Sequence, residues 1–255
     1  MSQRLAAATL SLFLMACSTA DGAPKTGLPP AASSPSPIVY AAVGASETLG
    51  IGARDPRREA WPQVFYRTAL PASAVFYDFG VPGETVAAAL RDEVPEALSV
   101  QPDLVTVWLN FDDIVNGVPA DQYGRDLDSL IVALRQGGRA EVLVANTPAL
   151  DRLPAYLARA NAATACPVIG RSAPPPDVVN AIVASYNAVI ARVATAEGAI
   201  LVDLAAGGEV PDSHPDWVSS DGFHPSTAGH AAIASTFATA VAGRLPASGI
   251  RGHSP

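Results

Sequence analysis

The stretch "IVYAAVGASETLG", residues 38 to 50, joins a continuous apolar run to a turn that carries a serine among small residues. Residues 38 to 44 show no alternation of polar and apolar side chains, which is typical of a parallel strand buried on both faces. We therefore expect Ser46 to lie just past the carboxyl end of a buried strand. A side chain at this edge of a parallel sheet is accessible to a ligand.

Four more continuous apolar runs follow, which we also expect to be strands buried on both faces, and stretches with helical spacing separate them. The runs are residues 74 to 80, 104 to 111, 140 to 148 and 199 to 205; the helical stretches are residues 58 to 70, 85 to 97, 121 to 136, 177 to 197 and 226 to 243. This alternation, with right-handed crossovers, predicts a three-layer α/β/α sandwich around a central five-stranded parallel sheet. Residues 149 to 176 break the alternation, and we interpret them as a loop inserted over the ligand-binding edge.

The length and charge of the chain limit the kinds of protein it can be. Its 255 residues, of which 49% are hydrophobic, are enough for one large core, which we place in residues 38 to 246. The 24 acidic and 16 basic side chains give a net charge of −8, which repels phosphate backbones and argues against a nucleic-acid partner. The two cysteines, Cys17 and Cys166, offer no disulfide framework.

Residues 1 to 16 have the features of a secretion signal, since Arg4 precedes an apolar run that is too short to span a bilayer. The sequence "LMAC" resembles a bacterial lipobox, which implies that Cys17 is the lipidated mature N-terminus. The alternative is an ordinary signal peptide with an incidental cysteine. Residues 17 to 37, rich in Pro, Ser and Ala, predict a disordered tether, and residues 247 to 255 a disordered tail. We expect a protein of the bacterial cell envelope whose lipid is its only membrane contact.

Candidate functional residues follow the first three predicted strands. Ser46 follows the first, but the G-x-S-x-G pattern of α/β-hydrolases is absent, and a lone serine there is more often a turn or N-cap residue. Gly83 follows the second strand and precedes a helix start, where backbone N–H groups are free to donate to a ligand. Asn110, Asp112 and Asp113 follow the third; in an extended chain the first two would share one side.

The stretch "DGFHPSTAGH", residues 221 to 230, places an acid three residues before a histidine. Asp221 can fix the tautomer of His224, which would make His224 a general base. Such a pair alone is usually a surface turn. Here it accompanies a serine, a glycine and a polar cluster that all lie at the edge where this architecture binds ligands.

Together these motifs resemble the SGNH or GDSL-type hydrolase family, which has a flavodoxin-like sheet, over essentially all of residues 38 to 245. "GASETLG" is similar to the first block of the family and "DGFHPSTAGH" to the fifth, which implies a nucleophilic Ser46, a base His224 and an acid Asp221. "GVPGETV" is similar to the second block, which implies that the Gly83 N–H helps to bind the oxyanion. The resemblance implies hydrolysis of carboxylic esters, such as small acyl esters, acetylated sugars or lipids, through an acyl-enzyme. It implies a small-molecule ester as partner, and no metal or cofactor.

Two departures from the family pattern stand out. Ala45 replaces the aspartate that precedes the nucleophile in the family, and an acid, Glu47, follows Ser46 instead. We expect this change to alter the support of the turn more than the chemistry. Asp112 stands where the family has an oxyanion-binding asparagine, and Asn110 stands at the glycine of that block. Loss of one oxyanion donor costs about 3 to 4 kcal/mol. An ionised carboxylate roughly 4 Å from the oxyanion adds about 4 kcal/mol of electrostatic repulsion to the activation free energy. Asp112 is therefore protonated, or turned away with Asn110 as donor, or catalysis is weak.

A second class of function fits the same residues: a lipid-anchored binding protein on a catalytically weakened scaffold. Asp112 favours this alternative, whereas the complete set of Ser46, Asp221 and His224 favours an enzyme. His214 and His230 lie near Asp221 and His224 in the sequence, but the histidines do not have the spacing of a known zinc motif. We therefore expect no metal site. The sequence leaves the natural substrate and the oligomeric state open.

Overall fold

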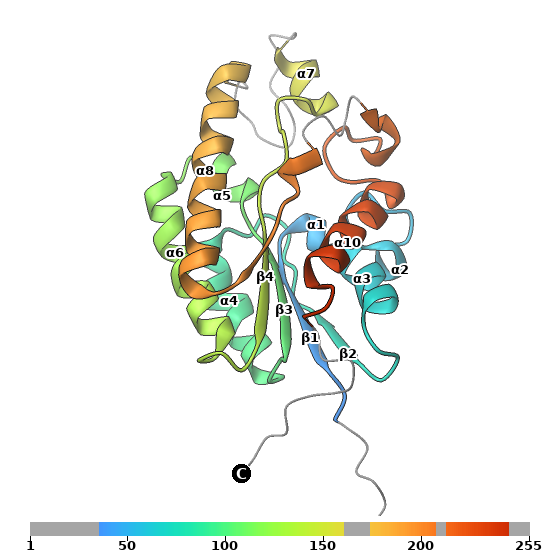
Figure 1. The fold of residues 1–255 in the computed structure, drawn as a ribbon. Coiled ribbons are helices and arrows are strands. Elements are labelled where there is room, and N and C mark those ends of the chain that lie inside the picture. The colour runs from blue at the N-terminus through green and yellow to red at the C-terminus, as the bar shows by residue number, and fades with distance from the viewer. Residues whose placement is uncertain (1–35, 161–173, 208–212, 245–255) are drawn as a thin grey trace, which may run out of the picture. The chain divides into compact units, whose positions relative to one another are not determined.

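A computed structural model describes residues 36–160, 174–207 and 213–244 of the chain, and its centre is a five-stranded parallel sheet (Figure 1). The strands are β1 (Val39–Gly44), β2 (Val75–Asp78), β3 (Leu104–Trp108), β4 (Glu141–Ala145) and β5 (Ile200–Val202). Their order, β2-β1-β3-β4-β5, is that of a flavodoxin-like sheet, so the predicted fold is confirmed. The predicted signal and tail, residues 17 to 35 of the predicted tether, and Cys17 and Cys166 lie outside the described residues.

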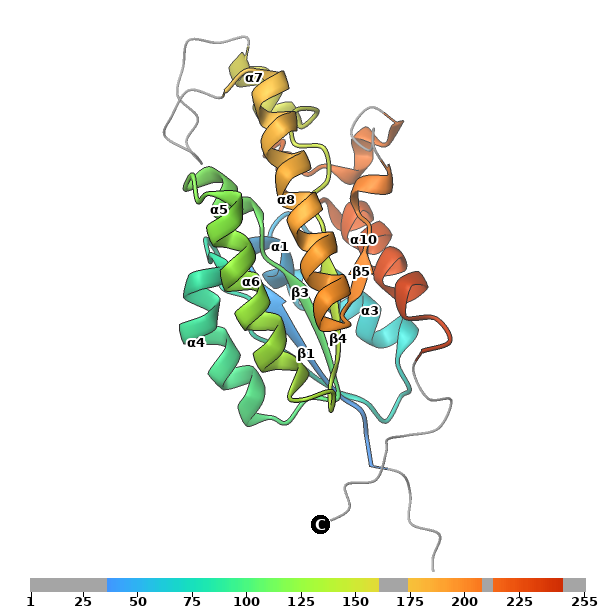
Figure 2. The same ribbon diagram turned by 60° about the vertical axis from the view of Figure 1, so that its left-hand side comes forward.

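Helices cover both faces of the sheet. Two views show α4 (Val86–Ser99), α6 (Ala120–Arg135) and α8 (Pro176–Glu197) on one face, with α3 (Trp61–Ala69) and α10 (Thr227–Val241) on the other (Figures 1 and 2). Local sequence fixes several helix ends. The Thr85 and Ser226 side chains cap α4 and α10 by accepting backbone N–H bonds, and Gly198 ends α8 in the left-handed conformation.

Successive residues of the central strands enter two separate cores. In β1, Ala41 and Val43 pack with the α4–α6–α8 layer, whereas Tyr40 and Ala42 pack with the α3–α10 layer. Strands β3 and β4 alternate in the same way. Burial on both faces explains why these runs are continuously apolar in the sequence. The two cores hold the sheet rigidly, and its carboxyl edge is therefore a fixed platform for the loops that follow.

The structure corrects the expectation for the second apolar run. Strand β2 is the edge strand and pairs only with β1, so most of its residues are exposed; Val75 is 37% and Tyr77 is 40% accessible. The prediction of burial on both faces was wrong here. A continuous apolar run predicts a strand, but it does not distinguish a central strand from an edge strand.

Short helices at the carboxyl edge are the other difference from the predicted elements. They are α1 (Ser46–Leu49), α2 (Pro56–Glu59), α5 (Phe111–Val115) and α7 (Pro154–Ala160), with 3₁₀ turns η1 (Ala205–Gly207) and η2 (Pro215–Trp217). Because α5 begins at Phe111, residues 110 to 113 are not extended, and the predicted alternation of Asn110, Asp112 and Asp113 was wrong. Helix α7 lies within the segment that we interpreted as an inserted loop.

Helix α8 is the one described helix that is long and apolar enough to cross a membrane, judged by length and composition. This is weak support for a membrane span, because the core helices of soluble proteins pass the same test. Residues Tyr186, Ile190 and Val193 on its inner side are buried in the core that α8 shares with α6 and the sheet.

Candidate active site

Ser46 lies at the first position of α1, directly after β1. The preceding turn is tight: a side chain on Gly44 would place its Cβ 2.0 Å from the Thr48 hydroxyl oxygen. The Gly44 N–H donates to the Glu93 carboxyl of α4 over 2.8 Å, which ties the turn to the neighbouring helix. Ser46 is 9% exposed, and its own amide belongs to the first turn of α1, where N–H groups have no partner within the helix.

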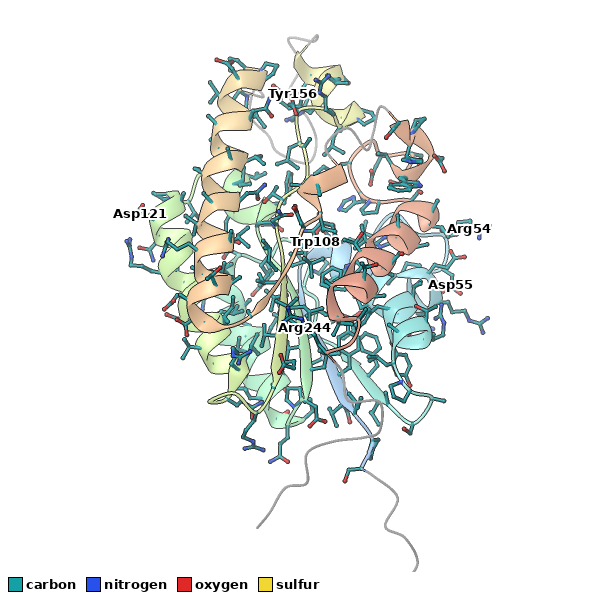
Figure 3. All side chains as sticks on the ribbon, in the orientation of Figure 1. Arg54, Asp55, Trp108, Asp121, Tyr156 and Arg244 are labelled. Atoms are coloured by element: carbon teal, nitrogen blue, oxygen red, sulfur yellow. The ribbon has the colours of Figure 1, made fainter. Side chains whose placement is uncertain are left out.

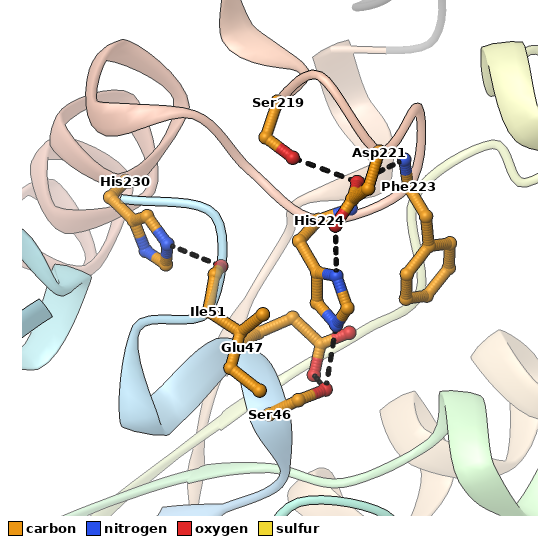
Figure 4. A network of polar contacts seen from close by, with 8 residues as sticks. All are labelled: Ser46, Glu47, Ile51, Ser219, Asp221, Phe223, His224 and His230. Atoms are coloured by element: carbon orange, nitrogen blue, oxygen red, sulfur yellow. Dashed lines mark hydrogen bonds and ion pairs between the residues drawn. The ribbon is translucent and has the colours of Figure 1, made fainter. Parts of the chain in front are cut away.

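The structure brings Ser46, His224 and Asp221 into one chain of hydrogen bonds (Figure 4). The His224 Nε2 atom lies 3.1 Å from Ser46 Oγ, and its Nδ1 atom lies 2.6 Å from Asp221 Oδ2. The other carboxylate oxygen, Oδ1, accepts from the Ser219 hydroxyl and from the backbone N–H groups of Phe223 and His224. Partial burial raises the pKa of Asp221, but these hydrogen bonds outweigh burial and lower the pKa to about 2. Asp221 is therefore ionised at neutral pH.

Glycine at position 52 allows the loop after α1 to reach His224. Its φ of +97° is a left-handed conformation, and a Cβ there would lie 2.2 Å from the Pro225 carbonyl oxygen and 3.0 Å from the His224 Cβ. The buried His230 holds the same loop from α10: its Nε2 lies 3.1 Å from the Ile51 carbonyl oxygen (Figure 4), and its Nδ1 accepts from the Trp61 N–H. Burial lowers the pKa of His230 to about 4, so the ring is neutral and serves packing.

Glu47 contacts the serine, which the sequence analysis did not anticipate. The Ser46 hydroxyl donates to Glu47 Oε2 over 3.2 Å (Figure 4). Glu47 is buried, with 8% of its surface exposed. Burial raises the pKa of Glu47, although hydrogen bonds and the nearby His224 oppose the increase. The contact could have been predicted only from the position of an acid directly after the serine. The four-residue helix that orients Glu47 toward Ser46 is too short to be recognised in the sequence.

The polar residues after β3 have three different environments. Asn110 is buried, and its side-chain N–H₂ donates to the Ala145 carbonyl over 3.4 Å. Asp113 is buried and accepts a hydrogen bond from the Val86 N–H over 3.0 Å. It therefore stabilises the start of α4 and is not a solvent-exposed loop residue. The Oδ2 atom of Asp112 is buried and has no hydrogen-bond partner within the described part of the chain. Burial, then the charges of Glu47 and Asp113, raise the pKa of Asp112 to about 7.

Gly83 lies in the turn between β2 and α4 and has a φ of +81°, which favours glycine. No atom lies within 4 Å of the position that a Cβ would occupy. The turn therefore leaves open space around this residue. Its predicted role as an oxyanion donor stays a prediction.

An apolar cavity of about 300 Å³ adjoins the serine and the histidine, since Glu47 on one side and Phe223 and Pro225 on the other form part of its wall. Trp108, labelled in Figure 3, lies at the end of β3 and lines the cavity. Its apolar lining is completed by side chains from five further segments: Phe111, Leu150, Leu153, Leu204, Trp217 and Ile233. Such a cavity is suited to a compact apolar group of a ligand.

Within residues 36–160, 174–207 and 213–244, no group of three or more His, Cys, Asp or Glu side chains is arranged to hold a metal ion. His214, which lies near the pair in sequence, stacks on Trp217 with ring centroids 3.9 Å apart. The site as described consists of a hydroxyl, an imidazole and carboxyl groups beside an apolar cavity. Such groups are suited to nucleophilic chemistry in which a hydroxyl is assisted by an imidazole and a carboxylate.

The sheet order defines a flavodoxin-like fold, and the hydroxyl, imidazole and carboxyl groups lie at its carboxyl edge, where hydrolases of this architecture have their sites. The model of the GDSL-like lipase/acylhydrolase family matches residues 42–232, and the chain belongs to this family. No curated protein matches the chain significantly.

Solved structures share the fold at low sequence identity. The crystal structure of TesA is 20% identical with a TM-score of 0.62, over 81% of this chain and 99% of that one. The lipase/acylhydrolase from Enterococcus faecalis is 18% identical with a TM-score of 0.62, over 82% and 97%. The acetyl xylan esterase AlAXEase is 16% identical with a TM-score of 0.59, over 80% and 100%. Family membership supports hydrolase activity, and the solved structures show that the fold is shared.

Proposed function

We propose that the protein is a serine hydrolase that cleaves carboxylic esters through an acyl-enzyme on Ser46. The observation that carries the proposal is the hydrogen-bonded chain from Ser46 through His224 to Asp221, with heavy-atom distances of 3.1 and 2.6 Å. These distances are within the range that proton transfer requires. His224 is 13% exposed, so the imidazole is largely shielded from bulk water.

The mechanism follows from the proton positions. Asp221, which stays ionised, accepts the Nδ1–H of His224, so Nε2 is left as the basic nitrogen that faces the serine. As the Ser46 oxygen attacks the ester carbonyl, Nε2 takes the hydroxyl proton, and the imidazolium then returns it to the leaving alcohol. Water, activated by the same nitrogen, releases the acyl group and frees the serine.

The oxyanion would be held by the backbone N–H groups of Ser46 and Gly83 and by a third donor after β3. Of the two candidates there, Asn110 already donates to Ala145, whereas Asp112 has a buried oxygen without a partner and a pKa raised to about 7. We assign the third donor to the protonated form of Asp112, because a neutral carboxyl donates a hydrogen bond where an ionised one repels the oxyanion. This favours the first of the three possibilities that the sequence left open.

The proposal is tested on the full chain with a fluorophosphonate probe and a panel of p-nitrophenyl esters from acetyl to dodecanoyl, with acetylated sugars included. Wild type should hydrolyse esters and become labelled, and Ser46→Ala should do neither. The Ser219→Ala variant is a useful comparison, because it removes a hydroxyl that bonds Asp221 but leaves the reacting groups in place. A wild-type protein that is neither active nor labelled would instead support the alternative of a binding protein on a weakened scaffold.

We further propose that the protein is lipid-anchored to the bacterial cell envelope through Cys17, with residues 17 to 37 as a tether. The support is the sequence alone: a short apolar segment that ends in "LMAC". Incorporation of radioactive palmitate in a bacterial host should be lost in Cys17→Ser. Incorporation that persists in this variant would reject the anchor.

A further inference from the structure

The Ser46 hydroxyl has one proton and two acceptors within reach. His224 Nε2 lies 3.1 Å from Ser46 Oγ, and Glu47 Oε2 lies 3.2 Å from the same oxygen. Only the first of these bonds leads to the proposed reaction, because a proton that already points at Nε2 can pass to it as the serine attacks. A hydroxyl that donates to Glu47 presents its proton to the wrong group.

The charge of Glu47 decides between the two acceptors. An ionised carboxylate accepts a charge-assisted hydrogen bond, which is roughly twice as strong as a bond to a neutral acceptor such as imidazole nitrogen. A protonated Glu47 has a hydroxyl of its own, and it can donate to the lone pairs of Ser46 Oγ. In that state the serine proton is left for His224. The contacts are the same in both states, and only the direction of the bond between Ser46 and Glu47 changes.

We propose that Glu47 is a positioning residue that controls the direction of the Ser46 hydroxyl: protonated Glu47 directs it to His224, and ionised Glu47 withdraws it. This inference rests on the proposed function, since it concerns the reactivity of Ser46. The location of Glu47 suits the role, because the residue is only 8% exposed and also lines the apolar cavity. An acyl group that enters the cavity would displace water from this carboxyl and so favour its neutral form.

Several charged groups surround Glu47 and bear on its ionisation. Burial raises its pKa most strongly; the charge of His224 lowers it and that of Asp221 raises it further. Glu47 in turn raises the pKa of Asp112. The titratable groups that face the site are Glu47 from α1, Asp112 and Asp113 from α5, Asp221 and His224 from the loop before α10, Glu84 from the turn before α4, and Asp203 after β5.

The experiment removes the effect of Asp112 first and then tests Glu47. In the full chain carrying Asp112→Asn, we expect kcat for p-nitrophenyl acetate to fall roughly tenfold on the alkaline side of its maximum, as ionised Glu47 withdraws the hydroxyl. Adding Glu47→Gln should raise kcat and convert the profile to a plateau, with little change in KM. The glutamine keeps the size of the side chain and stays neutral. The rate of fluorophosphonate labelling of Ser46 should change in parallel.

Matched controls separate a positioning role from a structural one. Glu84→Gln, in the same Asp112→Asn background, removes a carboxyl that is also buried (9% exposed) and has a raised pKa but makes no contact with Ser46; it should keep the alkaline decline. Glu47→Ala provides a second neutral variant if the glutamine disturbs folding, which thermal unfolding would reveal.

The outcomes are distinct. Superimposable pH profiles with and without Glu47→Gln, or an alkaline decline that disappears in Glu84→Gln as well, would overturn the role of Glu47 and leave the proposed function intact. Failure of the probe to label Ser46 in the wild-type protein would reject the proposed function, and the inference on Glu47 with it.

Discussion

The substitution Asp112→Asn tests the electrostatics of the site most directly. The Asp112 pKa of about 7 means that about half of the molecules carry an ionised carboxylate at pH 7, and roughly nine-tenths at pH 8. If only the neutral form binds the oxyanion, the wild-type rate falls with the neutral fraction. Asparagine is neutral at every pH and has an N–H₂ donor of similar reach.

The ratio of the variant rate to the wild-type rate should therefore rise with pH. We expect little difference near pH 6, about a twofold gain at pH 7 and roughly a tenfold gain at pH 8, since the neutral fraction of Asp112 falls from about nine-tenths to about one half and then to about one-tenth at these three pH values. The gain has an upper limit of about 10² to 10³, the cost of losing one oxyanion donor. The measurement is kcat/KM for p-nitrophenyl acetate between pH 6 and 9, corrected for the Ser46→Ala protein.

Asp113→Asn is the matched control. The Asp113 carboxyl is adjacent, buried and has a pKa raised to about 6, but it accepts from the Val86 N–H, a bond that asparagine retains. This variant should show no gain that increases with pH. A ratio for Asp112→Asn that stays constant from pH 6 to 9, or that lies at or below one, would show that Asp112 does not face the oxyanion.

Two further predictions concern the turn before the serine and the cavity. Burial raises the pKa of Glu93 from 4.5 to about 8, so between these pH values the folded state keeps a proton that the unfolded chain has released. The contribution of this proton to the free energy of unfolding is complete at low pH and is lost as the pH rises to about 8. Between pH 5 and 9, wild type should lose up to about 4 kcal/mol more unfolding free energy in urea than Glu93→Gln, and equal losses would contradict this. Ile233→Trp fills part of the cavity, so kcat/KM for octanoyl esters should fall at least about tenfold relative to acetyl esters; an unchanged ratio would place the acyl group elsewhere.

The sequence predicted the site where its residues follow the ends of strands. Ser46 follows β1 and Asn110 follows β3, and the order of the sheet makes these two strands neighbours. The pairing of Asp221 with His224 was predictable because they are three positions apart, so a single turn can join them. Chain topology alone therefore brings a serine, a histidine and an acid to one edge.

Other features depend on geometry that one sequence does not determine. The helical start at Phe111 replaces the extended backbone expected for Asp112 and Asp113, and a helix of five residues has too little periodicity to detect in the sequence. The contact of Glu47 with Ser46 depends on α1, which is only four residues long. The cavity is formed by side chains from the ends of β3, β4 and β5 and from α10, and their common volume appears only when the layers have packed.

Ser46 and His224 lie 178 positions apart in the sequence, which has a consequence for biogenesis. If His224 is the base that the proposed function requires, it is synthesised just before the last described helix, so Ser46 lacks this base until nearly all of the domain has left the ribosome. Reaction with a serine-directed probe would then report completion of folding, and a truncation before residue 221 would give a protein that no change of pH could activate.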